Sequence, residues 1–278
     1  QAGTIDLIDP STWKVFDAIF VGGSPGIFVY NPSNGYLYVA NNLGNNNYVV
    51  QVVGPHGVVS SIPLPGAPSW ITYDPVNNYV LVTTNAGVFA IKGFKVVHNY
   101  TSAYYRGTYT AFPQFLLVNP DTGAIYGVNS LILTYGLTYT DVFVFSPSNL
   151  SVVKYFQIRP AITPLSSAVF LKGKIYLLAG SQIYYINPTN GSYGVVLSLS
   201  PVTVSGGSVN MDFMTYSPQL DSFILVGQPP TPVFLVDLSN WRYFGIGVTI
   251  DDPAGAYDPA TGYYYVVNYY SSTIYAVN

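Results

Sequence analysis

One phrase is repeated along the chain: a short apolar strand, a turn of the Asn-Pro or Asp-Pro type, and a second strand with alternating aromatic residues. Most copies of the second strand end in Asn. Successive copies start 41 to 53 residues apart, which is the length of a propeller blade or of another solenoid unit. The turns lie at 31–35, 74–78, 119–123, 217–221 and 258–262, with a reduced copy at 172–174.

Within each unit the apolar residues either alternate or form short continuous runs, and no segment of a dozen residues has a helical period. We therefore predict an all-β chain that folds as a β-propeller of six four-stranded blades. Seven blades remain open, because the third unit is overlong. We predict one domain over 1–278, with blade units at 24–66, 67–108, 109–161, 162–203, 204–250 and 251–278, the last together with 4–23.

The N-terminal segment offers a way to close the ring. Residues 13–21 have the sequence of a fourth, outer strand but have no blade of their own. We expect this N-terminal strand to join the C-terminal blade, which supplies only three strands. The preceding segment, Thr4 to Asp9, is similar to a third strand. It either adds to the closing blade or pairs with a neighbouring subunit.

Charge is scarce in this chain. Charged residues make up 8% of it, and all 12 acidic residues are Asp. β-rich proteins disfavour Glu and Lys, which accounts for part of the depletion. An acidic habitat, in which carboxylates lose their charge, is the alternative that we favour. The nine Lys and Arg residues are scattered without a basic stripe, so nucleic acid is not an expected partner.

Two further absences narrow the function. The chain has no Cys, which excludes thiol catalysis and Cys-ligated metal sites and argues against a mesophilic secreted protein. Gly, Pro, Asn and Ser interrupt every apolar run before it reaches the 18 or more residues of a membrane span. We therefore expect no membrane span in this chain.

The closing segment of the second strand carries a family resemblance. Tyr38-Val39-Ala40-Asn41 resembles the Tyr-Val-Thr-Asn phrase of the YVTN-type β-propeller repeats of archaeal and bacterial surface-layer proteins, with degenerate copies at 81–85, 126–129 and 265–268. The composition is also similar to that of exported proteins of thermoacidophilic archaea and their viruses. These resemblances imply an extracellular, secreted structural or adhesive propeller of a cell surface, appendage or virion. Its partners would be other surface or filament proteins, further copies of itself, or glycans.

Two other functions remain open beside that one. The first is a propeller enzyme of the lyase, lactonase or hydrolase kind, acting at the channel mouth with Asp and His. Its candidate histidines, His56 and His98, have no metal-ligand spacing, and each lies in or beside an outer strand, where a solvated surface residue is expected. No Gly-x-Ser-x-Gly, dinucleotide or phosphate-loop motif is present. The second is a carbohydrate-binding propeller.

Three sets of residues are candidate sites. The glycosylation acceptors are Asn99, Asn149 and Asn190, each followed two residues later by Ser or Thr. A contact surface for sugars or subunits would use the tyrosines of the last unit, although packing is the interpretation that we favour. These tyrosines are Tyr263, Tyr264, Tyr265, Tyr269 and Tyr270.

A Ca²⁺ site is the third candidate, and it is the one cofactor that the sequence suggests. Asp212, Asp251 and Asp252 lie just before or at the start of first strands and would gather at the channel or its mouth. Turn chemistry is the simpler explanation, because Asp-Pro pairs are typical of loops. We therefore expect no catalytic residues and no resident metal.

Overall fold

The protein is described by a computed structural model in which every regular element is a β-strand, so the all-β prediction is confirmed for the described residues. No helix that would be suited to crossing a membrane occurs among them. The chain divides into two compact units, residues 1–131 with 141–157 and residues 132–140 with 158–278. The described residues are 3–9, 11–101, 104–106, 109–132, 138–199, 211–227, 232–249, 254–258, 261–268 and 273–277.

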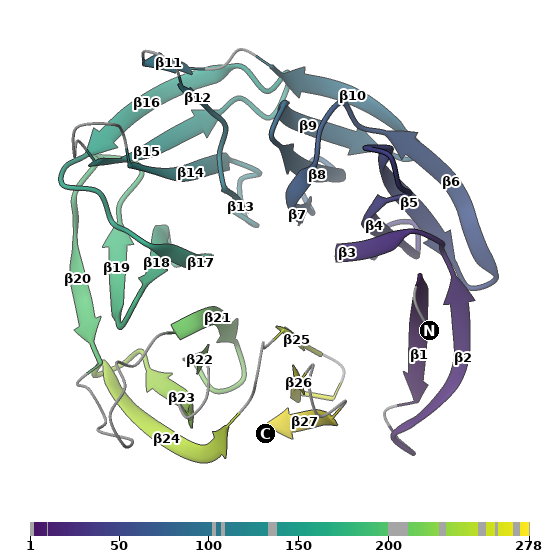
Figure 1. Ribbon diagram of the computed structural model, residues 1–278. Coiled ribbons are helices and arrows are strands. Elements are labelled where there is room, and N and C mark those ends of the chain that lie inside the picture. Colours follow the sequence, from purple (N-terminus) through teal and green to yellow (C-terminus); the bar gives the residue numbers. More distant parts are fainter. Residues whose placement is uncertain are drawn as a thin grey trace. The chain divides into compact units, whose positions relative to one another are not determined.

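The first unit begins with an antiparallel hairpin, β1 (Thr4–Asp9) and β2 (Lys14–Phe20), and continues with three four-stranded sheets (Figure 1). A small two-stranded sheet, β11 (Tyr104–Arg106) with β12 (Tyr109–Ala111), precedes the third sheet. The strands of the three sheets are β3 (Ser24–Asn31), β4 (Tyr36–Asn42), β5 (Tyr48–Gly54) and β6 (Gly57–Pro63); β7 (Pro68–Asp74), β8 (Tyr79–Thr84), β9 (Gly87–Lys92) and β10 (Lys95–Tyr100); and β13 (Phe115–Val118), β14 (Ile125–Ile132), β15 (Thr138–Phe145) and β16 (Val152–Ile158).

The second unit contains two four-stranded sheets and one sheet with three described strands (Figure 1). In all six sheets the strands follow one another in sequence order and neighbours are hydrogen-bonded. This is the blade pattern that the repeat predicts. The strands are β17 (Leu165–Leu171), β18 (Lys174–Ala179), β19 (Gln182–Ile186) and β20 (Tyr193–Ser198); β21 (Met211–Ser217), β22 (Ser222–Gly227), β23 (Pro232–Asp237) and β24 (Arg242–Thr249); and β25 (Ala254–Tyr257), β26 (Tyr264–Asn268) and β27 (Thr273–Val277).

The turn between the first two strands of each sheet forms for local reasons. The Asn31 side-chain oxygen accepts a hydrogen bond from the Ser33 amide at 2.9 Å, and Asp74 accepts one from the Val76 amide at 3.0 Å. Gly35 takes the left-handed backbone (φ 77°) that closes the first of these turns. The aspartates of such turns are therefore engaged in turn chemistry, as the sequence predicts.

Successive sheets of the first unit pack face to face. Tyr38 and Val50 of the β3–β6 sheet join Val80 and Phe89 of the β7–β10 sheet in one buried cluster. The Tyr38 hydroxyl accepts a hydrogen bond from the Asn34 amide at 2.8 Å and donates one to the Gly93 carbonyl at 2.9 Å. The buried tyrosine therefore links its own turn to the neighbouring sheet through hydrogen bonds as well as through apolar contact.

The second unit uses an aromatic core for the same purpose. Phe223 of β22 is fully buried, with its ring centre 5.2 Å from that of Tyr176 in β18 and 6.3 Å from that of Trp241. Ser167 of β17 donates a hydrogen bond to the Met214 carbonyl at 3.0 Å. Neighbouring sheets are therefore held by ring packing and by neutral hydrogen bonds.

The partner of the N-terminal outer strand differs from the expected one. Within the described part of the chain, β2 pairs with β1 across a tight turn and has no pairing with a strand of the last sheet. Asp9 favours this local hairpin, because its carboxylate accepts hydrogen bonds from the Ser11 amide at 2.8 Å and from the Thr12 hydroxyl at 2.9 Å. The two predicted strands, 4–9 and 13–21, are both present. We expect the N-terminal strand to join the C-terminal blade and close the ring. No described pairing supports this closure, so it stays a prediction.

The hairpin covers only part of the face on which it lies. Its apolar residues pack with Leu37 and Val39 of β4 and with Val53 of β5. Phe28 and Tyr30 of β3 lie directly opposite Val39 and Leu37 and therefore on the same face, but they are 58% and 53% exposed. The hairpin thus shields the two middle strands of this sheet, β4 and β5, and leaves its inner strand, β3, open.

Candidate functional site

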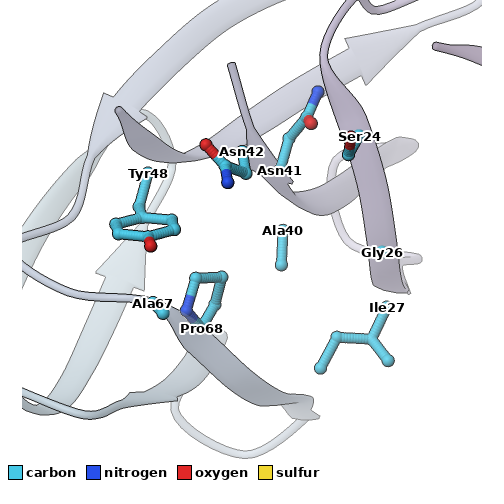
Figure 2. Close-up of a pocket in the computed structure, with 9 residues that line it drawn as sticks. All are labelled: Ser24, Gly26, Ile27, Ala40, Asn41, Asn42, Tyr48, Ala67 and Pro68. Carbon is cyan, nitrogen blue, oxygen red and sulfur yellow. The ribbon is translucent and has the colours of Figure 1, made fainter. Parts of the chain in front are cut away.

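Two grooves lie in the first unit at the ends of the second strands, opposite the Asn-Pro and Asp-Pro turns. The first groove has a volume of about 150 Å³ and is shown in Figure 2; its lining residues are Ser24, Gly26, Ile27, Ala40, Asn41, Asn42, Tyr48, Ala67 and Pro68. The second groove has a volume of about 640 Å³; its lining residues are Ala67, Pro68, Ser69, Thr84, Asn85, Phe112, Pro113, Gln114 and Asn129. Both grooves share Ala67 and Pro68, which separate them.

The closing Asn of the repeat lines the first groove. Asn41 is 1% exposed, and its amide nitrogen donates to the Gln51 side-chain oxygen at 2.7 Å and to the Gly22 carbonyl at 2.9 Å. Gln51 in turn donates to the Val21 carbonyl at 2.9 Å. This Asn therefore holds the segment that enters β3. The Asn41 side-chain oxygen has no hydrogen-bond partner among the described residues.

The second groove contains two asparagines with different tasks. The Asn85 side-chain oxygen accepts a hydrogen bond from the Ala67 amide at 2.9 Å and so fixes the chain as it enters β7. Gly66 lacks a Cβ where one would clash with that oxygen. Asn129, which is 9% exposed, makes no hydrogen bond within the described part of the chain. Its amide is thus available to a ligand or to water.

Neither groove is lined by a charged side chain. Amide and hydroxyl groups alternate there with the rings of Tyr48, Pro68, Phe112 and Pro113. Such a lining offers hydrogen bonds and flat apolar surfaces to a neutral polar ligand. Sequence reasoning identified the closing Asn but missed the grooves, because they form only when the start of one sheet lies beside the end of the next.

The two histidines lie apart from these grooves. His56 is exposed in the turn between β5 and β6, and with Asp17 it lines a third hollow of about 410 Å³. His98 of the outer strand β10 packs edge-on against Tyr79, with ring centres 5.8 Å apart. The sequence prediction that both lie in or beside outer strands is confirmed. No Ser, Thr, Cys or Lys side chain lines the hollow of His56.

The three glycosylation acceptors are all exposed. Asn99 lies on β10, while Asn149 and Asn190 lie in turns. In the two turns the Asn side-chain oxygen accepts a hydrogen bond from the amide of the acceptor serine, Ser151 or Ser192, at 2.9 Å. All three positions are therefore accessible, and whether they carry glycans stays a prediction.

The predicted tyrosine surface is divided by the alternation of β26. Tyr264 is 1% exposed within an apolar cluster, and burial raises the pKa of its phenol. Tyr263 and Tyr265 lie on the opposite side with their rings stacked 6.3 Å apart. Tyr269 and Tyr270 lie outside the described residues. Packing thus accounts for the central tyrosine and leaves its two neighbours as surface candidates.

The predicted Ca²⁺ site cannot be assembled from the residues that the structure describes. Asp212 is half-buried in β21, whereas Asp251 and Asp252 lie outside the described residues. No group of three His, Asp or Glu side chains able to hold a metal occurs in the described part. The calcium site therefore stays an untested candidate beside the turn chemistry that the sequence favours.

Comparisons with known proteins identify the fold. Hydrazine synthase of Kuenenia stuttgartiensis is similar over 99% of this chain and 89% of its own, with a TM-score of 0.79 and 15% identity. The Swd1 β-propeller domain of Myceliophteria thermophila is similar over 99% of this chain and 90% of its own, with a TM-score of 0.68 and 9% identity. The WD40 β-propeller domain of Doa1 covers 95% of this chain and 82% of its own, with a TM-score of 0.59 and 13% identity.

These likenesses show a β-propeller fold and nothing finer. The similar structures include an enzyme and domains of the WD40 class, at identities that carry no function. No family model matches the chain, and no curated protein matches it in sequence. The predicted fold class is therefore confirmed, while the resemblance to YVTN-type repeats remains a resemblance.

Proposed function

We propose that this propeller is a non-enzymatic extracellular module of an archaeal cell surface, appendage or virion, which holds proteins or glycans through neutral surfaces. The observation that carries this function is the chemistry of the two grooves, which are lined by amides, hydroxyls and rings but by no carboxylate, imidazole, ammonium or guanidinium group. Catalysis of proton transfer needs groups of tuned pKa gathered at one place. Adhesion needs only complementary hydrogen bonds and apolar contact.

Ion pairs contribute little to the described part of the chain. Lys172 and Asp221 form the one salt bridge there, at 2.9 Å, and both side chains are more than half exposed. Hydrogen bonds from Lys172 and Tyr216 hold the pKa of Asp221 below its ordinary value, and a hydrogen bond from Ser239 does the same for Asp237. Exposed pairs of this kind stabilise proteins weakly. Stability then depends on apolar packing and on neutral hydrogen bonds.

We expect folding to resist acid and to fail in base. Carboxylates with lowered pKa stabilise the fold above about pH 3.9, and their contribution is lost only as the pH falls through the lower folded value. Burial raises the pKa of Tyr38, Tyr126, Tyr176 and Tyr264, so the unfolded chain loses these protons first above about pH 10 and folding weakens there. The urea concentration at the unfolding midpoint, measured between pH 3 and 11, reports the change of stability in acid and in base. A cooperative transition above about pH 4 would contradict this origin of stability.

Surface location is tested by limited proteolysis of intact source cells or virions, followed by mass spectrometry of the released peptides. We expect peptides of this chain in the released fraction, and glycan-bearing masses on those that contain Asn149 or Asn190, because both acceptors are exposed in turns. A cytosolic marker protein in the same cells is the control. Release of the chain only after lysis would overturn the extracellular proposal.

An enzyme of the hydrolase or lyase kind is the second candidate, favoured by the hollow that Asp17 and His56 share. The variant with both His56→Ala and His98→Ala distinguishes the two functions. A hydrolase that depends on these residues loses its turnover in the double variant, whereas an adhesive module keeps its binding and its assembly. Turnover of a lactone or ester by the unaltered chain, abolished in this variant, would establish the enzyme.

A further inference from the structure

The two grooves lie on either side of the start of β7. Ala67 and Pro68 belong to the lining of both, so a ligand that fills one groove reaches the other by crossing these two residues. Both residues are half-buried and carry no charge. The pair of grooves therefore suits an elongated ligand made of at least two similar neutral parts.

Each groove contains a buried amide with unused hydrogen-bonding capacity. The Asn41 side-chain oxygen is an acceptor without a donor, although the nitrogen of the same amide is fully engaged. The Asn129 amide has neither a donor nor an acceptor opposite it among the described residues. Leaving the buried Asn41 oxygen unpaired costs about 1 to 3 kcal/mol, so a hydrogen-bond donor such as a water molecule or a ligand hydroxyl is expected there. The Asn129 amide carries no such penalty and offers its hydrogen-bonding groups to a ligand at the groove wall.

Rigid rings stand beside both amides. In the first groove the Tyr48 hydroxyl donates to the Asn46 side-chain oxygen at 3.0 Å, and Figure 2 shows the rings of Tyr48 and Pro68 beside the open space. In the second groove the Phe112 ring packs edge-on against Tyr100, with ring centres 6.5 Å apart. A flat ring next to hydrogen-bonding amides is complementary to a ligand that has apolar faces and a polar rim.

We propose, on the basis of the adhesive function above, that the two grooves bind a neutral saccharide chain, with one sugar ring in each groove and the linkage crossing Ala67 and Pro68. A pyranose presents C–H groups on its faces and hydroxyls at its edge, which matches the rings and amides of the lining. A charged ligand would find no counter-charge in either groove. An extended peptide binds most readily along an open strand edge, and both grooves are bounded by strand ends instead.

Two substitutions fill the grooves without disturbing the buried amides. A Cβ at Gly26 would meet only the Ala40 carbonyl oxygen, at 3.6 Å, which is ordinary contact, so Gly26→Leu places a side chain at the first groove. Ser69 is exposed at the second groove, where Ser69→Leu does the same, although it also removes the hydrogen bond between the Ser69 and Thr83 hydroxyls at 2.7 Å. Ser61→Leu on the exposed side of β6, outside both grooves, is the matched control.

The probes are maltotriose, mannotriose and triacetylchitotriose, together with an uncharged peptide of Ser, Asn and Tyr, each titrated into the full chain. We expect at least one trisaccharide to bind with a dissociation constant of about 1 mM or lower. Its binding should shift the side-chain amide resonance of Asn129 and weaken about tenfold in Gly26→Leu and in Ser69→Leu, but not in Ser61→Leu. Thermal unfolding of each variant shows whether the fold is retained.

Three results would overturn the saccharide site. They are the absence of binding by all three trisaccharides at about ten times that concentration, binding by the peptide alone, and saccharide binding that both filled variants retain. A chain that binds a trisaccharide in the grooves but is never released from intact cells overturns the extracellular function and leaves the site standing. A chain that is released from intact cells but binds none of the three trisaccharides overturns the saccharide site and leaves the extracellular function standing.

Discussion

Phe223→Ala is expected to destabilise the protein by about 3 to 5 kcal/mol, the range for removing a large ring from a packed core. Phe223 is fully buried in the second unit. Its ring centre lies 5.2 Å from that of Tyr176, 6.2 Å from that of Tyr216 and 6.3 Å from that of Trp241. Three aromatic neighbours from two sheets cannot collapse into the space together, so the cavity term adds to the lost burial.

Denaturant unfolding followed by tryptophan fluorescence measures this loss, because Trp241 reports directly on the cluster. Phe244→Ala is the matched control, since Phe244 is 59% exposed on β24 and its removal should change the unfolding free energy by less than about 0.5 kcal/mol. Similar losses in both variants would mean that sheet-to-sheet ring packing does not hold the second unit together.

Local patterns carried most of the fold prediction. The segment Tyr38-Val39-Ala40-Asn41, predicted to close a second strand, lies in β4 (Tyr36–Asn42), and the Asn31 turn before it fixes where this strand begins. Alternation of side chains at the start of β26 separates Tyr264, which is buried, from Tyr263 and Tyr265. These features depend on a few neighbouring residues and on a period of two, both of which a single sequence displays.

Long-range partners were the part that the sequence could not supply. The segment 13–21 has the composition of an outer strand, and either β1 or the last sheet satisfies that composition equally well. The choice of β1 depends on the Asp9 turn, with its hydrogen bonds to Ser11 and Thr12, which closes the hairpin locally. The additional β11–β12 pair, Tyr104–Arg106 with Tyr109–Ala111, crosses the predicted boundary between the units 67–108 and 109–161.

The candidate site likewise depends on a local pattern and on long-range contacts. The closing Asn was visible as a repeated letter, but its two roles depend on what each copy meets in the folded chain. Asn41 meets Gln51 and the carbonyl of Gly22, whereas Asn129 meets no partner among the described residues. The closing Asn of the repeat therefore stabilises the fold through hydrogen bonds in the β3–β6 sheet, whereas in the β13–β16 sheet it lines a groove.

Substitution of these two asparagines should separate the roles. Asn41→Ala leaves the Gln51 side-chain oxygen and the Gly22 carbonyl without their donor, and each stranded buried group costs about 1 to 3 kcal/mol, so we expect a loss of about 2 to 4 kcal/mol. Asn129→Ala removes no hydrogen bond to a described residue and should cost less than about 1 kcal/mol. Urea unfolding of both variants measures the difference.

A double-mutant cycle shows whether Asn41 stabilises the protein through its hydrogen bond to Gln51. Asn41 and Gln51 are joined at 2.7 Å and both donate to the Val21 carbonyl, at 3.5 Å and 2.9 Å, so their substitutions by Ala should be coupled by about 0.5 to 3 kcal/mol. Asn41 and Asn129 share no partner, and their effects should add within about 0.5 kcal/mol. Additive losses for Asn41 with Gln51 would place the stabilising effect of this Asn in something other than the side-chain network that anchors the entry to β3.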